Sequence, residues 1–338
     1  MKKIIFSIVC CLLATVQYAY AQQDYGKVFL LHAGKITSTF AGNDVDKAIA
    51  AAAEGDTLFL SKGRFNSNFT INKSLSLIGS GVDSNNIQSS NSTWLGWNGE
   101  TNIQSENNKT IASVYVEGIS FSYSFGVRGK VDNLTIKKCY FNNGLYFNSN
   151  SNYEYKTVVV DRCRVSSLSM SGSIQELTAK NCKISSCGGQ GGTTLTSCKL
   201  INCNIRQVDQ NTKAMFVNSV INEVGDGTSQ YLGENAILVN TLFHVLNGYD
   251  PMEKTSQQDC WSTTETVISN NSGDMDCTMT AEQLKSAGYL GVDGTVVGIE
   301  GGVNPYTLTI HAPSINSKSA NVDLTNKKVT INVNVTAN

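Results

Sequence analysis

Apolar and small side chains recur along the middle of the chain in a pattern that restarts every 16 to 24 residues. The restart positions, which we call anchors, are Ile119, Cys139, Cys163, Cys182, Cys203, Ser219 and Thr241. The residues five and three positions before each anchor are apolar or small, and the residue two positions after it is apolar. A repeat of this length is typical of a solenoid, in which each turn packs only on its neighbours.

The spacing inside each repeat predicts two short strands joined by a sharp corner. Side chains on one face of a strand are two residues apart, so positions −5 and −3 belong to one strand and positions 0 and +2 to the next. The residue directly before each anchor marks the corner: Gly118, Lys138, Arg162, Asn181, Asn202, Asn218 and Asn240. Gly and Asn favour the left-handed backbone conformation of a tight corner. We therefore expect an all-β chain whose coils stack in parallel.

Three segments outside these repeats resemble parts of a known architecture. DVDKAIAAAAEGDTLFLSKGRF (44–65) is similar to the N-terminal cap of the right-handed parallel β-helices of the pectate-lyase-like superfamily, a short helix followed by Gly-Asp-Thr, a strand and a glycine turn. INKSLSLIGSG (71–81) resembles the second coil of that fold. YLGVDGTVVGIEGGVNPYTL (289–308) resembles a segment that closes β-helices in secreted proteins of gut-type Bacteroidetes. The resemblance implies a right-handed parallel β-helix over residues 22–310, and no particular activity, because the superfamily includes lyases, hydrolases and adhesins.

The first 21 residues have the pattern of a secretory signal peptide. Lys2 and Lys3 precede an apolar run over residues 4–16, and small residues stand at Ala19 and Ala21. We expect cleavage after Ala21 and a secreted, periplasmic or cell-surface protein. No later apolar run is long enough to span a bilayer, so we expect no membrane span.

Composition narrows the range of partners. Removal of the two signal-peptide lysines lowers Lys plus Arg from 26 to 24 against 27 acidic residues, a net charge of 24 − 27 = −3. This balance argues against a nucleic-acid partner. The chain has 29 glycines and only 3 prolines, which fits many tight turns between short strands.

The cysteines are predicted to have two different roles. Cys139, Cys163, Cys182 and Cys203 share the inward anchor position, and we expect a stack of buried thiols beneath the corner. The three histidines, His32, His244 and His311, lie far from these coils in sequence, so we expect neither a metal site nor a cofactor. Cys260 and Cys277 lie outside the repeat in a polar segment, and we predict a disulfide between them.

Charged residues do not form the catalytic set of a known lyase or hydrolase on this fold, and we expect no catalytic residues. The best constellation is a basic strip on the outward faces, in which Lys180 or Arg164 could act as a base beside Asp161 on an acidic polysaccharide. The same residues have a second interpretation. Glu117, Lys137, Asp161 and Lys180 alternate in sign on successive coils, as in a ladder of paired cross-strand charges.

Aromatic residues in loops offer a candidate glycan-binding surface. The candidates are Trp94, Trp97, Tyr140, Tyr146, Tyr153 and Tyr155. Aromatic rings stack on the CH faces of sugars, while nearby Asn and Ser side chains bind hydroxyl groups. The same rings could instead pin their own loops to the solenoid. We expect an exported, non-catalytic protein that presents loops to a polysaccharide or cell-surface ligand, with a lyase or hydrolase of acidic polysaccharide and a structural surface rod as alternatives.

Outward positions become apolar from the coil of Cys203 onward: Ile201, Met215, Val217, Val220, Ile237, Val239 and Leu242. A patch of this size is normally covered. Two alternating segments near the C-terminus, ANVDLT (320–325) and KVTINVNV (328–335), predict a β-hairpin. We expect residues 311–338 to pack on the last coils of a monomer, with homodimerisation through this face as the alternative.

Overall fold

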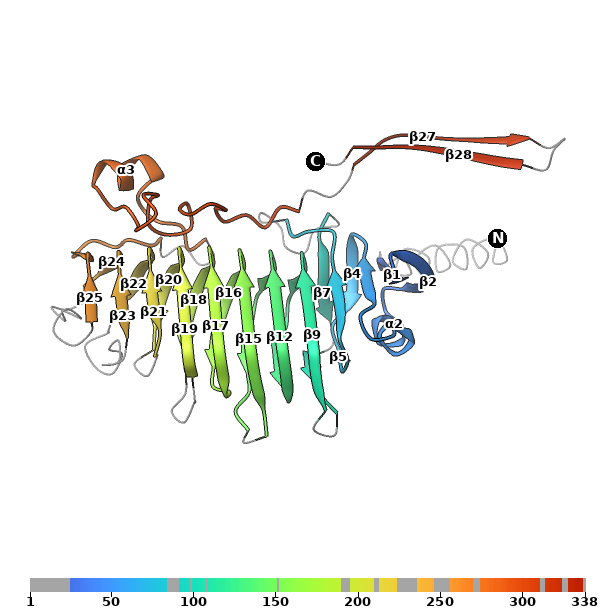
Figure 1. Cartoon of the computed structure of the whole chain (residues 1–338). Helices are drawn as coiled ribbons and strands as arrows, with labels where there is room; N and C mark the ends of the chain where they lie inside the picture. Colours follow the sequence, from blue (N-terminus) through green and yellow to red (C-terminus); the bar gives the residue numbers. More distant parts are fainter. Residues whose placement is uncertain are drawn as a thin grey trace, which may run out of the picture.

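The computed structural model describes residues 25–83, 91–97, 99–106, 109–150, 152–189, 195–209, 213–223, 236–245, 256–269, 274–310, 314–323 and 328–336. The signal peptide predicted at 1–21 lies outside these residues. Within them the chain is almost entirely β, with two short helices, α2 (Val45–Ala51) and α3 (Ala281–Ser286). Strands stack side by side along one long axis (Figure 1). The predicted all-β parallel solenoid is confirmed.

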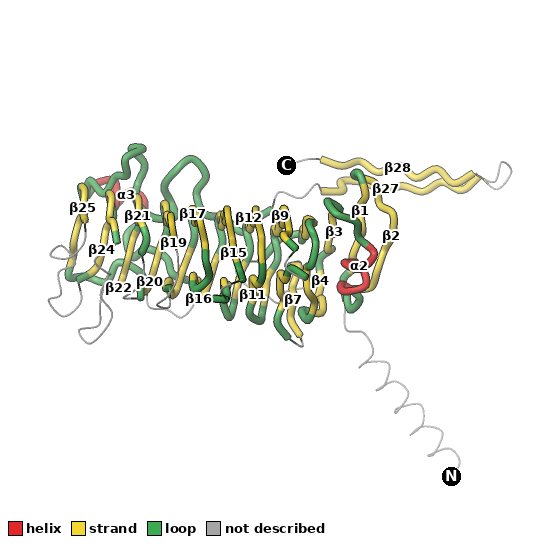
Figure 2. The backbone as a smooth tube through the Cα atoms, turned by 60° about the horizontal axis from the view of Figure 1, so that its bottom comes forward, coloured by secondary structure: helices red, strands yellow, loops and turns green. Residues whose placement is uncertain are grey.

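The first sheet carries the strand that precedes each corner. Its parallel strands are β3 (Thr57–Leu60), β6 (Leu75–Ile78), β9 (Thr110–Glu117), β12 (Lys130–Lys137), β15 (Glu154–Asp161), β17 (Ile174–Lys180), β19 (Leu195–Ile201), β21 (Met215–Val217), β23 (Ile237–Val239) and β25 (Ser256–Gln258). Two antiparallel strands, β1 (Lys27–His32) and β2 (Lys35–Ala41), extend it beyond β3. Helix α2 lies at this N-terminal end (Figure 2) and buries Val45, Ala48 and Ile49.

The second sheet carries the strand that follows each corner. Its parallel path is β4 (Gly63–Asn66), β7 (Thr93–Trp97), β10 (Ser120–Phe121), β13 (Tyr140–Phe141), β16 (Arg164–Met170), β18 (Lys183–Gly188), β20 (Asn204–Val208), β22 (Val220–Glu223), β24 (Leu242–His244) and β26 (Trp261–Thr263). A branch of the same sheet contains β5 (Phe69–Ile71), β8 (Thr101–Gln104), β11 (Phe125–Arg128) and β14 (Leu145–Phe147).

All seven predicted corner residues adopt the left-handed conformation. Their φ angles lie between 43° at Asn240 and 68° at Gly118. Lys138 and Arg162 adopt it as well, at 48° and 53°, although long side chains rarely do. The identical corner in every coil keeps the strands in register, which compensates for the strain at these two residues.

The interior is filled by the residues that the repeat predicts to face inward. The four anchor cysteines are fully buried, as predicted, and all eight cysteines of the described residues are free thiols. Burial raises the pKa of the Cys198 thiol to about 12 and that of Cys203 well above its usual value. These thiols therefore stay protonated and unreactive near neutral pH.

We expect the mature native protein to show slow or no reaction with a thiol reagent at its six buried cysteines. The six are Cys139, Cys163, Cys182, Cys187, Cys198 and Cys203. Reagent uptake and mass mapping before and after denaturation measure this, because unfolding exposes every thiol at once. The half-buried Cys260 and Cys277 serve as the internal control and should be modified first. Rapid modification of an anchor cysteine in the native protein would contradict the buried stack.

A C-terminal segment runs back along the corner from the last coils to the first ones. We call residues 289–310 the strap. Its contacts follow the coils in reverse order, since Leu290 lies at Asn240, Gly301 at Asn181 and Thr309 at Lys138. The strap ends at Ile310, whose side chain packs directly on Gly118. A Cβ atom added at Gly118 would lie only 2.0 Å from it, so this position has room only for glycine. Figure 1 shows this segment following the upper edge of the strands.

The chain ends in an antiparallel hairpin of β27 (Ser314–Asp323) and β28 (Lys328–Thr336). Figures 1 and 2 both place this hairpin at the end of the solenoid that carries β1 and β2. This arrangement does not set residues 311–338 on the last coils of the same chain, and their packing on such a surface stays a prediction.

Candidate functional site

We call residues 264–310, which end in the strap, the C-terminal segment. Asparagines of the corner and of the second sheet bind its described parts by their side-chain amides. Asn181 donates from Nδ2 to the Gly301 carbonyl at 2.8 Å. Asn218 Oδ1 accepts from the backbone N–H of Val292 at 3.1 Å. Asn222, which is 2% exposed, accepts from the N–H groups of both Val267 and Ile268, each at 3.1 Å. The sequence explains the corner asparagines only by their backbone conformation, so this second role was missed.

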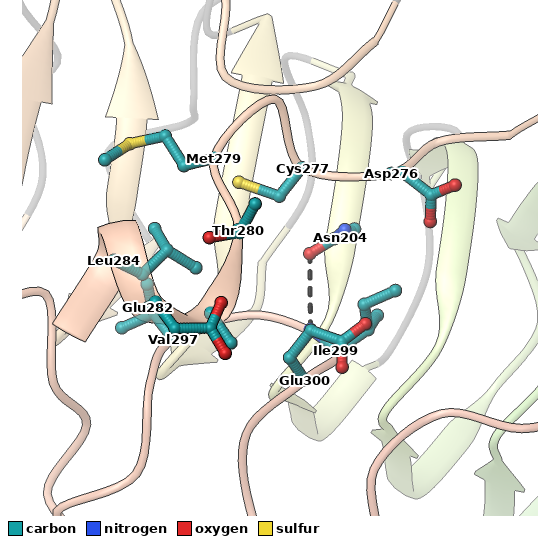
Figure 3. A pocket seen from close by; sticks show the side chains of 11 residues that line it. Asn204, Asp276, Cys277, Met279, Thr280, Glu282, Leu284, Val297, Ile299 and Glu300 are labelled. Atoms are coloured by element: carbon teal, nitrogen blue, oxygen red, sulfur yellow. Dashed lines mark hydrogen bonds between the residues drawn. The ribbon is translucent and has the colours of Figure 1, made fainter.

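A pocket of about 360 Å³ lies between Asn204 of β20 and residues 276–300, which include helix α3 (Figure 3). Asn204 lies at its base and accepts a hydrogen bond from the Ile299 N–H at 3.3 Å. Leu284 and Val297 are buried and supply apolar lining, while Glu282 and Glu300 add carboxylates. The pocket lining therefore combines apolar side chains with one amide and several carboxylates.

The side chains of this pocket do not include an activated nucleophile. Burial raises the pKa of the Cys277 thiol, which keeps it protonated near neutral pH. Asp276 is paired with Lys183, whose Nζ lies 2.5 Å from its Oδ1. Among the described residues, no group of three or more His, Cys, Asp or Glu side chains could hold a metal ion.

The predicted disulfide between Cys260 and Cys277 is wrong for this structure. Both are free thiols. Cys260 packs against the main core, whereas Cys277 packs against a second apolar cluster formed beneath the C-terminal segment. The polar neighbours of the two cysteines suggested exposed partners in one loop, but the chain folds them onto different clusters.

Arg164 of the basic strip and its register partner Lys183 make internal contacts. Lys183 is only 9% exposed, and its Nζ lies 4.9 Å from the centre of the Tyr306 ring in the strap. Arg164 stacks on Tyr140, with 5.0 Å between the guanidinium carbon and the ring centre. These two cations of the second sheet are therefore bound to aromatic rings of the protein itself.

The alternating charges on the first sheet lie opposite one another, as a charge ladder requires. Glu117 is the register partner of Lys137, which pairs with Asp161, and Asp161 pairs with Lys180. Arg162 adds a salt bridge to Asp161, with 2.7 Å between Nη2 and Oδ2. The alternative catalytic set is divided between the two sheets, because Lys180 and Asp161 lie on β17 and β15 while Arg164 lies on β16. The strap is bound to the corner between those sheets.

Two of the predicted glycan-binding aromatics are buried, and we correct their assignment. Tyr155 is fully buried, and its hydroxyl donates to the Val127 carbonyl at 2.6 Å. Tyr140 is 7% exposed, because Leu308 and Tyr306 of the strap pack over it. Neither ring has a face that a sugar could reach.

Two other candidates are partly exposed: Trp94 contacts the neighbouring coils, and Tyr146 pins its own loop. The Trp94 indole N–H donates to the Ser122 hydroxyl, and the Arg64 guanidinium lies 5.2 Å from the Trp94 ring centre. The Tyr146 hydroxyl donates to the Asn143 carbonyl at 2.6 Å. Tyr153 packs against the main core as a partly buried side chain. The side chain of Trp97 lies outside the described residues.

One exposed aromatic residue was missed by the sequence analysis. Tyr123 is 42% exposed, in the turn between β10 and β11. The equivalent turn of the next coil holds Asn142 and Asn143, both exposed. The available signal was its position in a turn, two residues after the inward Phe121. Trp94, Tyr123 and Tyr146 therefore surround two stacked turns, and we call them the aromatic surface.

The strand row that contains Tyr146 is uncharged, whereas the row of Trp94 begins with Arg64. Outward positions of β8, β11, β14, β16 and β18 lie in register along the solenoid: Asn102, Gly126, Tyr146, Ser169 and Gly188. Small and polar side chains leave the rings accessible from the side and supply amide and hydroxyl groups. Such a surface is suited to the hydroxyl groups and CH faces of a neutral sugar.

No protein-family model, curated protein or solved structure matches the chain. None of the helices that the structure describes has the length and hydropathy of a membrane span.

Proposed function

We propose that this protein is an exported, non-catalytic β-helix that binds a glycan at the aromatic surface. The observation that carries the proposal is the set of three partly exposed rings, Trp94, Tyr123 and Tyr146, around two turns rich in Asn and Ser. The signal peptide predicted at residues 1–21 supports export, to the periplasm or the cell surface. The order of α2, strand β3 and the Gly63 turn supports membership of the pectate-lyase-like superfamily.

Removal of the exposed rings should weaken glycan binding without unfolding the protein. We expect Tyr123→Ala and Tyr146→Ala each to lower affinity roughly fivefold, because one stacked ring contributes about 1 kcal/mol. A glycan array on the mature protein identifies the ligand, and calorimetry on the best hit measures the affinities.

The matched control is Tyr25→Ala, which removes an exposed tyrosine at the N-terminal end of the solenoid. Its affinity should equal that of the wild type. An array without any bound glycan would refute the proposal. Unsaturated uronate products from an acidic polysaccharide that disappear in Lys180→Ala would establish the lyase alternative instead.

A further inference from the structure

Among the residues that the structure describes, the apolar outward face of the last coils is covered on the second sheet but not on the first. On the second sheet, Val220 and Leu242 are fully buried and belong to the apolar cluster beneath the C-terminal segment. On the first sheet, the corresponding outward residues remain partly exposed: Ile201, Met215, Val217, Ile237 and Val239. We call these five residues the open apolar face.

The open apolar face is continuous from coil to coil. Val217 is the register partner of Ile201 on one side and Val239 on the other, and Met215 pairs with Ile237. Ile237 is 38% exposed. In the described part of the chain, the three buried apolar clusters include none of these five side chains. The five residues thus form two adjacent rows on the sheet, Ile201–Val217–Val239 and Met215–Ile237. Exposed apolar patches of this kind often mark a binding surface for another protein segment.

The same chain contains an element with a complementary pattern. In the C-terminal hairpin, Val322 is opposite Val329, Ala320 opposite Ile331, and Ile315 opposite Val335. Residues between these positions are mostly Ser, Asn and Thr, so the hairpin sequence alternates between apolar and polar. A two-stranded hairpin is only marginally stable in water, and it is stabilised when an apolar surface receives one of its faces.

The strap fixes the start of this hairpin far from the open apolar face of its own chain. Ile310 lies against Gly118, directly after β9. The open apolar face begins on β19, four coils further along the first sheet, or about 19 Å at 4.8 Å per coil. Residues 311–313 let Ser314 reach at most about 14 Å from Ile310, so the hairpin starts short of that face, and it reaches the face of its own chain only by turning back along the solenoid. Figures 1 and 2 show the hairpin directed away from the last coils, toward and past the end of the solenoid that carries β1 and β2.

We propose that the C-terminal hairpin of one copy docks on the open apolar face of a second copy. Donor and acceptor surfaces are at opposite ends of one molecule, so the contact joins copies head to tail. Such a contact is heterologous, and it extends to a chain of molecules unless the rotation closes a ring. The strands that carry the aromatic surface take no part in the proposed contact between copies.

The test uses full-length mature protein and sedimentation at increasing concentration. We expect the weight-average mass of the wild type to rise with concentration. An acceptor variant, Val217→Lys with Ile237→Lys, and a donor variant, Ile331→Lys, should each remain monomeric. Matched controls place the same lysine at polar positions, Thr135→Lys on an earlier coil and Asn332→Lys in the hairpin, and should assemble like the wild type.

Mixing the two defective variants separates this contact from other modes of association. The acceptor variant keeps a working hairpin and the donor variant keeps a working face, so the mixture should form one-to-one dimers that do not grow. Circular dichroism checks that each variant is folded. A wild type that stays monomeric at every concentration overturns the proposal, as does a hairpin cross-linked to the face of its own chain. Symmetric dimers of either single variant would overturn it too.

Discussion

Replacement of Asn222 by alanine is expected to lower the free energy of unfolding by about 2 to 6 kcal/mol, since each of two buried N–H groups left without a partner costs roughly 1 to 3 kcal/mol. Asn222 Oδ1 is the acceptor for Val267 and Ile268, at the point where the C-terminal segment turns onto the second sheet. Val267 and Ile268 are 3% and 0% exposed, so water cannot replace the amide without opening the cluster. Urea denaturation measures the loss.

Hydrogen exchange shows where the effect is located. Protection should fall most in residues 264–297, because that segment depends on the lost acceptor, while the first coils should keep theirs. Asn143→Ala is the matched control, since this asparagine lies exposed in a turn, and it should change the stability by less than about 0.5 kcal/mol. An Asn222→Ala protein as stable as the control would contradict the assigned role.

The repeat in the sequence predicts the solenoid because its signals are local. A side chain faces inward or outward according to its position in a strand, and the corner conformation depends on the residue at that position. Asn181 and Asn202 illustrate this, since both adopt positive φ as their residue type suggests. The alignment of anchors also predicts the register between coils, including the opposition of Lys137 and Asp161.

The candidate site was predicted less well because its burial depends on contacts distant in sequence. Tyr140 has the parity of an outward residue, and nothing near it in sequence shows that Leu308 covers it. Asn181 binds the carbonyl of Gly301, 120 residues away. Tyr155 lies at an inward position at the start of β15, and its aromatic neighbours made it look like a loop residue. Coverage by the strap, which no local pattern reveals, is what buries Tyr140.

The stacked phenylalanines of the early coils should make the largest single contribution to core stability. Phe121 and Phe141 lie in adjacent coils with their ring centres 4.9 Å apart and their planes at 4°. Phe125 meets both edge-on, at 4.9 Å and 5.6 Å. All three side chains are buried. Each ring therefore supports two others, and removal of one leaves a cavity that rigid neighbouring coils cannot close.

We expect Phe141→Ala to lower the free energy of unfolding by about 3 to 5 kcal/mol, the usual cost of removing a buried phenylalanine ring. Phe141→Leu is the matched control, because it keeps most of the apolar volume, and it should cost less than about 1.5 kcal/mol. Urea denaturation of both variants measures the difference. Because each coil packs only on its neighbours, the loss should spread outward from β13, and hydrogen exchange should increase first in β10 and β16. Equal stabilities for the alanine and leucine variants would show that the coils relax around the cavity, and would contradict a rigid aromatic stack.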